Sequence, residues 1–139
     1  DPSDYGRMIE PIIDGQSEVV LGIRRSPIGD ERRLHIMYWL SWIGNKLITV
    51  TTNLLYGNKA GEYEGCYKAL TRHAIDEVEV RADGFEYDNE LICKLLRAGY
   101  RTVDVPIYYS PRDYVGGKKI RWTDGFRILG TIVKCRLLN

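Results

Sequence analysis

The chain has almost no excess of charge of either sign. Its 20 Lys and Arg residues are balanced by 19 Asp and Glu residues, for a formal net charge of +1. Because such a chain has no global positive field to attract phosphates, a nucleic-acid partner is not expected. Cysteine and histidine are also scarce, with three and two residues respectively. The cysteines are widely spaced without a CxxC pair, which predicts buried free thiols and excludes a disulfide framework or a zinc site.

Long hydrophobic runs are missing too. The longest nearly apolar stretch, residues 34–44, is shorter than the roughly 20 residues that span a bilayer. Hydrophobic residues nevertheless make up 44% of the 139 residues and charged residues 28%, which is an ordinary globular balance. The length suits one domain or the larger part of one.

Strand and helix patterns alternate along the chain, which predicts a layered α/β domain. Short β-branched runs predict strands at 18–22, 66–70 and 102–109, and the proline at position 106 places the last strand at an edge or a bulge. Apolar periodicity predicts helices before Gly15, at 34–56, at 73–78, at 88–98 and from an N-cap at Asp124 to about 137.

The helix predicted at 34–56 carries two sets of large side chains. Steps of four and three residues place one apolar stripe on a single face, and we expect that stripe to pack on the domain core; it comprises Ile36, Leu40, Ile43, Leu47, Val50 and Leu54. Tyr38, Trp39 and Trp42 lie beside or opposite the stripe. Two interpretations stay open for them: contact with a membrane–water interface, or packing against another part of the protein.

A cluster of arginines follows the first buried strand, in a loop predicted at 23–33. Loops at strand ends are where α/β domains hold ligands, and guanidinium forks match phosphate oxygens in a bidentate way. The cluster, which comprises Arg24, Arg25, Arg32 and Arg33, is therefore a candidate phosphate site. The alternative is a solvated basic surface.

A second basic segment, predicted as a glycine-rich loop at 110–121, contains Arg112, Lys118 and Lys119 around two adjacent glycines. Such a loop can fold over a diphosphate or a lipid phosphate. It is not a P-loop, because the spacing from lysine to a following Ser or Thr is wrong.

Three carboxylates are candidate catalytic groups. Glu62 precedes the second predicted strand, whereas Asp88 and Glu90 lie at the start of the helix predicted at 88–98. Acidic residues at a helix start also stabilise it through the helix dipole by about 0.3–1 kcal/mol each. That structural role stays open for Asp88 and Glu90.

The order of these groups resembles the dolichyl-phosphate mannose synthase branch of family 2 glycosyltransferases, across nearly all of the chain. Short motifs carry the resemblance in sequence: Asp1-Pro-Ser-Asp-Tyr5, Val19-Val-Leu-Gly-Ile-Arg24, Leu40-Ser-Trp-Ile-Gly-Asn45, Thr52-Asn-Leu-Leu-Tyr-Gly57, Glu64-Gly-Cys-Tyr-Lys-Ala69, Gly84-Phe-Glu-Tyr-Asp-Asn-Glu-Leu91, Gly99-Tyr-Arg101, Val105-Pro-Ile107, Tyr109 with Arg112, and Gly117-Lys-Lys-Ile120 with Trp122 and Asp124-Gly125. The family usually has Asp where Glu62 stands.

The resemblance implies a partial GT-A fold, with residues 1–139 forming the C-terminal, acceptor-side part of a single domain. The nucleotide-binding half, about one hundred residues with an Asp-x-Asp motif for Mg²⁺ or Mn²⁺, is then expected before Asp1. The implied reaction is inverting transfer of a sugar from a nucleotide sugar to a polyprenyl phosphate, at the cytoplasmic face of a membrane. Arg24 matches a residue near the donor phosphates, and the 110–121 segment matches a loop over donor or acceptor phosphate. Without the metal-binding half, this chain by itself is expected to be inactive.

Two alternatives to this function stay open. One is a glycosyltransferase whose acceptor is the hydroxyl of a soluble or cell-wall sugar, which would need a carboxylate within about 3 Å of the attacking oxygen. The other is a module that binds phosphate or anionic lipid without chemistry.

Overall fold

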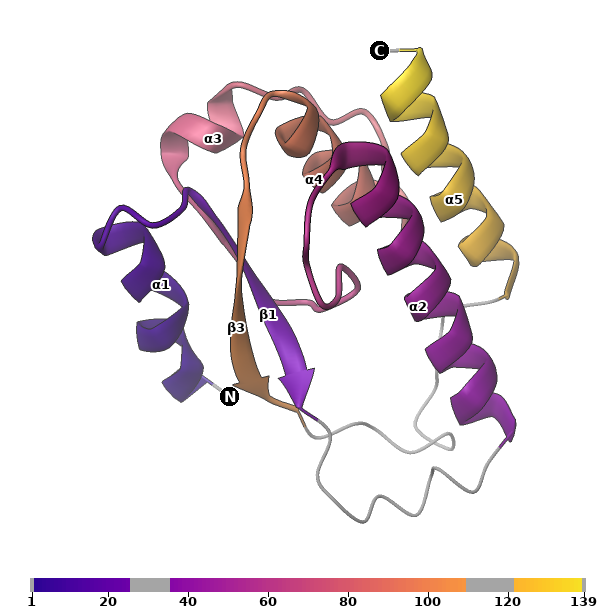
Figure 1. Ribbon diagram of the computed structural model, residues 1–139, viewed down its shortest axis with the longest axis horizontal. Coiled ribbons are helices and arrows are strands. Elements are labelled where there is room, and N and C mark those ends of the chain that lie inside the picture. The colour runs from indigo at the N-terminus through magenta and orange to yellow at the C-terminus, as the bar shows by residue number, and fades with distance from the viewer. Residues whose placement is uncertain (1, 26–35, 110–121, 139) are drawn as a thin grey trace.

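The computed structural model describes residues 2–25, 36–109 and 122–138 (Figure 1). Those residues form an α/β arrangement of a small sheet with flanking helices, as the alternating pattern predicted. After a 3-10 turn at Pro2–Asp4, the elements are α1 (Tyr5–Ile13), β1 (Val19–Arg25), α2 (Ile36–Tyr56), β2 (Lys68–Leu70), α3 (Arg72–Asp76), α4 (Tyr87–Arg97), β3 (Thr102–Tyr108) and α5 (Trp122–Leu137).

The sheet is mixed, with strand order β2-β1-β3. β1 is antiparallel to β2 and parallel to β3, in a register that pairs Val19 with Thr102 and Arg25 with Tyr108. A parallel pair needs a long crossover, which α2, α3 and α4 provide between β1 and β3. Within the described sheet β3 is an edge strand, so the prediction of an edge position for Pro106 is confirmed.

Helices cover both faces of the sheet. Figure 1 shows α1 on one face and α2, α4 and α5 on the other. Side chains alternate along β1, so Val19 and Leu21 point to the larger helical layer, whereas Val20 packs with Met8 beneath α1. Burial on both faces explains why β1 reads as a continuous apolar run.

The larger layer holds the main core. Ile92 and Leu95 of α4 and Ile132 of α5 are almost fully buried. α2 joins this core through Tyr56, whose hydroxyl donates to the Ile132 carbonyl oxygen at 2.8 Å. Truncating one of these aliphatic side chains to alanine would cost about 2–5 kcal/mol of stability, because little can refill the cavity.

The predicted inward stripe of α2 is wrong: in the structure that stripe faces outward. Leu54 is 79% exposed and Leu40 56%, and Ile43, Leu47 and Val50 are exposed as well. Trp39 and Trp42 share this outer surface, about half exposed. We call the surface formed by Trp39, Leu40, Trp42, Ile43, Leu47, Val50 and Leu54 the outer face of α2. The side chains of Ile36 and Tyr38 lie outside the described part.

The face that α2 buries is smaller and more polar. It presents Ile48, Thr49, Thr52 and Tyr56 to the core. The two threonines can be buried because each hydroxyl donates back to its own helix, Thr49 to the Asn45 carbonyl at 2.8 Å and Thr52 to the Ile48 carbonyl at 2.9 Å. Periodicity identifies an apolar face but does not show which side the protein covers.

Three smaller expectations need correction. β1 runs to Arg25, so Arg24 and Arg25 belong to the strand rather than to a loop, because β1 stays paired with β3 up to Tyr108. α5 begins at Trp122, which places Asp124 in its first turn instead of at the N-cap. Cys66 is exposed, whereas the other two thiols are buried as predicted.

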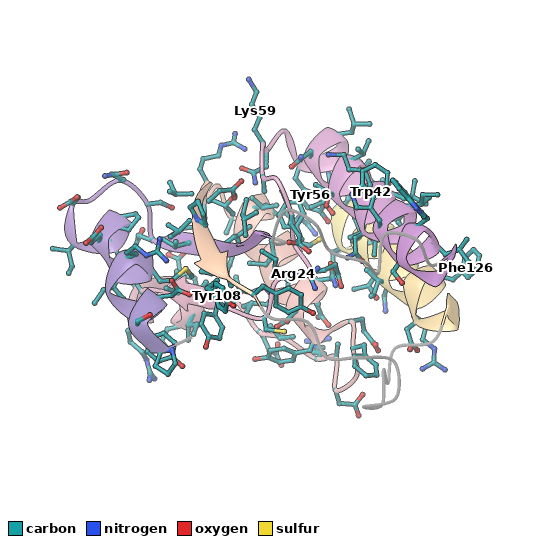
Figure 2. The ribbon with its side chains drawn as sticks, turned by 90° about the horizontal axis from the view of Figure 1, so that it is seen from below. Arg24, Trp42, Tyr56, Lys59, Tyr108 and Phe126 are labelled. Carbon is teal, nitrogen blue, oxygen red and sulfur yellow. The ribbon has the colours of Figure 1, made fainter. Side chains whose placement is uncertain are left out.

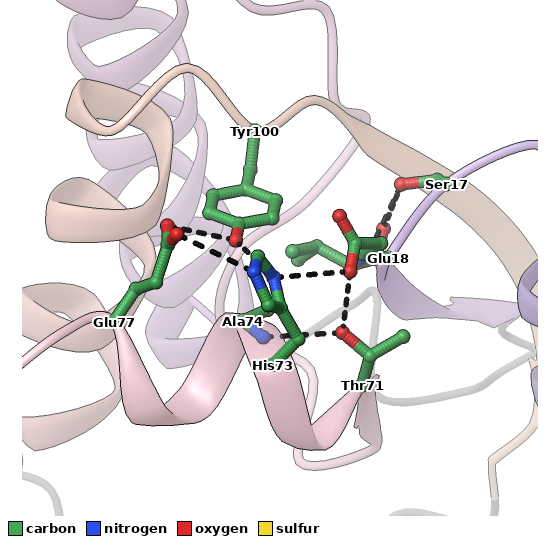
Figure 3. A network of polar contacts seen from close by, with 8 residues as sticks. Ser17, Glu18, Thr71, His73, Ala74, Glu77 and Tyr100 are labelled. Atoms are coloured by element: carbon green, nitrogen blue, oxygen red, sulfur yellow. Dashed lines mark hydrogen bonds and ion pairs between the residues drawn. The ribbon is translucent and has the colours of Figure 1, made fainter.

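A network of polar contacts closes the edge of the sheet where β1 and β3 begin, which we call the amino edge (Figure 3). Thr71 caps α3 by accepting from the Ala74 backbone N–H at 3.2 Å, and its hydroxyl donates to Glu18 at 2.9 Å. The Tyr100 hydroxyl lies 2.9 Å from His73 Nδ1 and donates to Glu77 at 2.8 Å. These contacts attach α3 to the starts of both strands.

Candidate functional site

The carboxyl ends of the parallel strands β1 and β3 meet at the opposite edge, which we call the carboxyl edge. Arg24 stands opposite Ile107 there, and Arg25 stands opposite Tyr108. Figure 2 shows Arg24 beside the end of β3 that carries Tyr108. Since ligands of open α/β sheets bind outside the carboxyl ends of the strands, this edge is the candidate site.

Glu62 lies against Arg24 at the carboxyl edge. The Arg24 Nη2 atom donates to Glu62 Oε1, and the Arg24 backbone N–H approaches Oε2 at 3.4 Å. Their side chains are only 22% and 15% exposed, so solvent screens the pair less than a surface ion pair. The Arg24 guanidinium also lies over the Tyr109 ring, 5.2 Å from its centroid. A guanidinium has five N–H donors, more than the contact with Glu62 uses.

Close backbone contacts bring Glu62 to this place. The segment 57–67 passes along β1, and the Gly22 backbone N–H donates to the Tyr67 carbonyl at 2.8 Å. A Cβ on Gly65 would lie 2.2 Å from the Gly22 carbonyl oxygen, and a Cβ on Gly22 would lie 2.9 Å from the Tyr67 Cβ. Only glycine fits at both positions, because any side chain would push the segment off the strand.

A second pair joins Lys68 to Asp88. Lys68 Nζ donates to Asp88 Oδ2 at 3.0 Å and to the Gly65 carbonyl at 2.6 Å. The lysine side chain is 7% exposed, whereas Asp88, in the first turn of α4, is 51% exposed. The structure thus places Asp88 beside the same 57–67 segment that carries Glu62, with a carboxylate that solvent or a ligand can reach.

Glu90 has a different environment from the other two predicted carboxylates. It accepts hydrogen bonds from the backbone N–H groups of Arg81, at 3.2 Å, and Ala82, at 2.9 Å, and it pairs with Lys94 at 2.6 Å. Burial raises the pKa of Glu90, but these three donors outweigh burial and hold the pKa below its ordinary value. The contacts give Glu90 a structural role in holding residues 81–82 on α4, and its catalytic role stays a prediction.

The aromatic residues at the carboxyl edge were not predicted from the sequence. The rings of Tyr5 and Tyr67 lie 5.4 Å apart at 40°, and the hydrogen bond with Tyr5, followed by burial, raises the pKa of Tyr67. Asp4 is buried and accepts from the Tyr108 backbone N–H at 2.9 Å, which attaches the start of α1 to the end of β3. The signal available in the sequence was the count of ten tyrosines against two phenylalanines.

Several predicted phosphate-binding residues cannot be placed. Arg32, Arg33, Arg112, Lys118 and Lys119 lie outside the described residues, and so does the side chain of Arg25. Among the described residues, the structure pairs Arg24 with Glu62 and Lys68 with Asp88. For the other cations, phosphate binding stays a prediction.

The described residues contain no group of three His, Cys, Asp or Glu side chains that could hold a metal ion. They therefore supply no donor set for Mg²⁺ or Mn²⁺. Of the helices in the described ranges, none is both long enough and apolar enough to cross a membrane.

The arrangement defines an α/β domain with paired cations and carboxylates at the carboxyl edge of its sheet. Such an edge suits a substrate that carries phosphate and hydroxyl groups. No family model matches the chain, and no solved structure matches it.

Among curated proteins, the chain is similar to glycosyltransferase AglJ of Haloferax volcanii. The two are 26% identical over 113 residues, which cover 79% of this chain and 35% of AglJ. The chain thus spans about a third of the length of this relative. The similarity supports a relationship between this chain and glycosyltransferases.

Proposed function

We propose that this chain is the acceptor-side part of a GT-A glycosyltransferase that transfers a sugar from a nucleotide sugar to a polyprenyl phosphate, with inversion. The observation that carries the proposal is the Arg24–Glu62 pair, which presents a guanidinium at the carboxyl edge. The layered α/β architecture and the similarity to a glycosyltransferase support the reaction class. The acceptor class comes from the family resemblance of the motifs.

In the proposed reaction, an oxygen of the acceptor phosphate attacks the anomeric carbon of the donor sugar. The bond between that carbon and the nucleotide diphosphate breaks, and its electron pair leaves with the diphosphate. A phosphate is already ionised at neutral pH, so the attack needs no general base. The role proposed for this chain is electrostatic. Arg24 would stabilise the negative charge on the acceptor phosphate and on the leaving diphosphate, and further candidates for the same role are Arg112, Lys118 and Lys119.

The pairing at the edge fits such a role better than base catalysis by Glu62. Its carboxylate already accepts from Arg24, so its main effect is to orient the guanidinium. A metal ion would neutralise the leaving diphosphate when bound. The described residues offer no donor set for such an ion.

A hydroxyl acceptor is the second candidate, and one observation favours it. Asp88 is half exposed and lies beside the same segment as Glu62, so its carboxylate could take a proton from an attacking hydroxyl. This alternative predicts a requirement for Asp88 that a phosphate acceptor would not impose.

The acceptor class can be tested with the full-length protein. Labelled nucleotide sugars would be offered with a polyprenyl phosphate in detergent, or with free saccharides, and the products separated by solvent extraction. Label in the lipid fraction is the expected result. Transfer to saccharides alone would replace the proposal with the hydroxyl acceptor, and binding of phosphate compounds without transfer would replace it with a non-catalytic module.

We also propose that the outer face of α2 contacts the membrane that holds such an acceptor. Figure 2 shows Trp42 on α2 and Phe126 on α5 on the side of the molecule away from the sheet. Lys46 is exposed among the apolar side chains of the outer face, and α5 carries exposed Arg127 and Lys134. Tryptophan favours the membrane–water interface, and the cations favour anionic headgroups.

Flotation of the full-length protein with anionic liposomes tests this contact. A Trp39→Ala/Trp42→Ala variant should float less than wild type, and an Arg72→Ala variant, altered on the distant helix α3, should float like wild type. Equal flotation of the double variant and wild type would show that these tryptophans instead pack against another part of the protein.

A further inference from the structure

The segment that carries Glu62 is held by a buried polar network that no element of the proposed mechanism uses. Asn53 of α2 forms two hydrogen bonds with the main chain of Ala60: its Nδ2 donates to the carbonyl at 2.9 Å, and its Oδ1 accepts from the N–H at 3.1 Å. The same Oδ1 accepts from the Tyr63 hydroxyl at 2.7 Å. One amide side chain therefore fixes the chain on both sides of Glu62.

Further contacts complete the network. Asn58 Nδ2 donates to the Tyr63 hydroxyl at 2.8 Å and to Thr102 Oγ1 on β3 at 2.7 Å. The Gly61 N–H donates to Asp104 Oδ2 at 2.7 Å, also on β3. Tyr63 is 2% exposed, and burial raises its pKa to about 12, so the hydroxyl keeps its proton and remains a donor.

The network determines where the Glu62 carboxylate can go. Residues 60, 61 and 63 are each bonded to α2 or β3, so the Glu62 backbone has little freedom, although its side chain points to β1. A Cβ on Gly61 would lie 2.8 Å from Ile23 Cδ1, which shows how tightly the segment fits against the strand that carries Arg24. A carboxylate held this way needs no further ordering to orient a guanidinium.

We propose that Asn53 is a positioning residue for the Arg24–Glu62 pair and that it acts through the main chain of Ala60 and the hydroxyl of Tyr63. The inference rests on the proposed function, because it takes the pair to belong to the substrate site. Asn53 itself belongs to α2 and contacts the segment rather than the pair. Its effect on turnover therefore depends on Glu62 being present.

Hydrogen exchange and kinetics on the full-length protein separate positioning from a general loss of fold. Asn53→Ala should speed amide exchange in peptides covering residues 57–67 and lower kcat/KM by roughly 10- to 100-fold, the usual range for loss of a group that orients an active-site residue. Asn45→Ala, about two turns earlier on the same helix, should change neither. Tyr63→Phe keeps the ring and should give a smaller change in the same direction, and it is the variant to use if Asn53→Ala does not fold.

A double-mutant cycle supplies the decisive comparison. In a Glu62→Gln background, Asn53→Ala should lower kcat/KM by less than two-fold, because the carboxylate that it positions is gone. An equal fold-loss in both backgrounds, or unchanged exchange at 57–67, would overturn the proposal. If the full-length protein transfers no sugar to any acceptor, the proposed function fails, and the exchange measurement alone decides whether Asn53 holds the segment.

Discussion

The two edges of the sheet use similar side chains in different ways. At the amino edge, His73 lies 3.5 Å from Glu18 and 3.6 Å from Glu77, and these groups are about half exposed or more. At the carboxyl edge, the Arg24–Glu62 pair is mostly buried and is held by a segment with glycine-only backbone contacts. The first edge can rearrange in water at little cost, whereas the second is ordered before any ligand arrives. Charged residues alone thus do not identify a site; burial and backbone support separate the two edges.

The largest expected effect comes from removing the cation at the carboxyl edge. Arg24→Ala in the full-length protein should lower kcat/KM by about 10- to 100-fold, since a charged hydrogen bond contributes roughly 1.5–3 kcal/mol. Steady-state kinetics with saturating acceptor measures the loss. Arg72→Ala at the amino edge is the control and should retain wild-type turnover. Wild-type kinetics in Arg24→Ala would show that the pair only supports the fold.

Asp88→Asn should have a smaller effect if the acceptor is a phosphate. Asp88 is 51% exposed, so solvent screens its contact with Lys68, and Lys68 keeps its bond to the Gly65 carbonyl. The loss should therefore cost under about 1 kcal/mol, or roughly five-fold or less in kcat/KM. If Asp88 is instead the base for a hydroxyl acceptor, the loss rises to roughly 10²- to 10⁴-fold. The size of the loss in kcat/KM therefore distinguishes the two acceptor classes.

Asp104 should affect stability in a pH-dependent way. Burial raises its pKa above the ordinary 3.8, although the Gly61 N–H partly opposes this. Because the pKa of Asp104 is raised in the folded state, its protonated carboxyl contributes favourably to folding stability below pH 3.8. This contribution is lost as pH rises through the folded-state pKa. Asp104→Asn should therefore raise Tm at pH 7, with a gain that shrinks on acidification. A gain that is constant from pH 7 to pH 3 would contradict this.

The smallest effect is expected at the amino edge. His73→Ala removes exposed contacts, so the free energy of unfolding should change by no more than about 0.5 kcal/mol and kcat/KM should stay at the wild-type value. Chemical denaturation measures the free energy of unfolding, and steady-state assays measure kcat/KM. A loss of turnover in His73→Ala would show that the amino edge also affects catalysis at the carboxyl edge.

The elements of the fold were largely predictable from local patterns. β1 and α4 stood out because a β-branched run and an amphipathic repeat are local signals, and Gly57, at a φ of +63°, ends α2 as the C′ rule predicts. The orientation of α2 was not predictable. Its buried threonines satisfy their hydroxyls within the helix, and no local rule indicates that a helix will turn its more apolar face outward.

The candidate site was predictable in its residue types more than in its connections. Arg24, Glu62 and Asp88 were selected from sequence, and the structure pairs Arg24 with Glu62 and Asp88 with Lys68. The pairing of Lys68 with Asp88 was not predicted, because the two residues are distant in sequence. Asn53 was not selected, because its partner Ala60 is contacted through backbone groups. Tertiary pairing of this kind leaves no periodic signal.

The exposed thiol of Cys66 provides a built-in attachment point for a reporter group. It follows Gly65 directly, beside the contact with β1, whereas the other two cysteines are buried. Burial raises the pKa of Cys93 to about 12, which keeps that thiol from forming the reactive thiolate. A maleimide fluorophore should therefore label Cys66 selectively among the three cysteines, and its emission would report on ligand occupancy at the carboxyl edge without any engineered mutation.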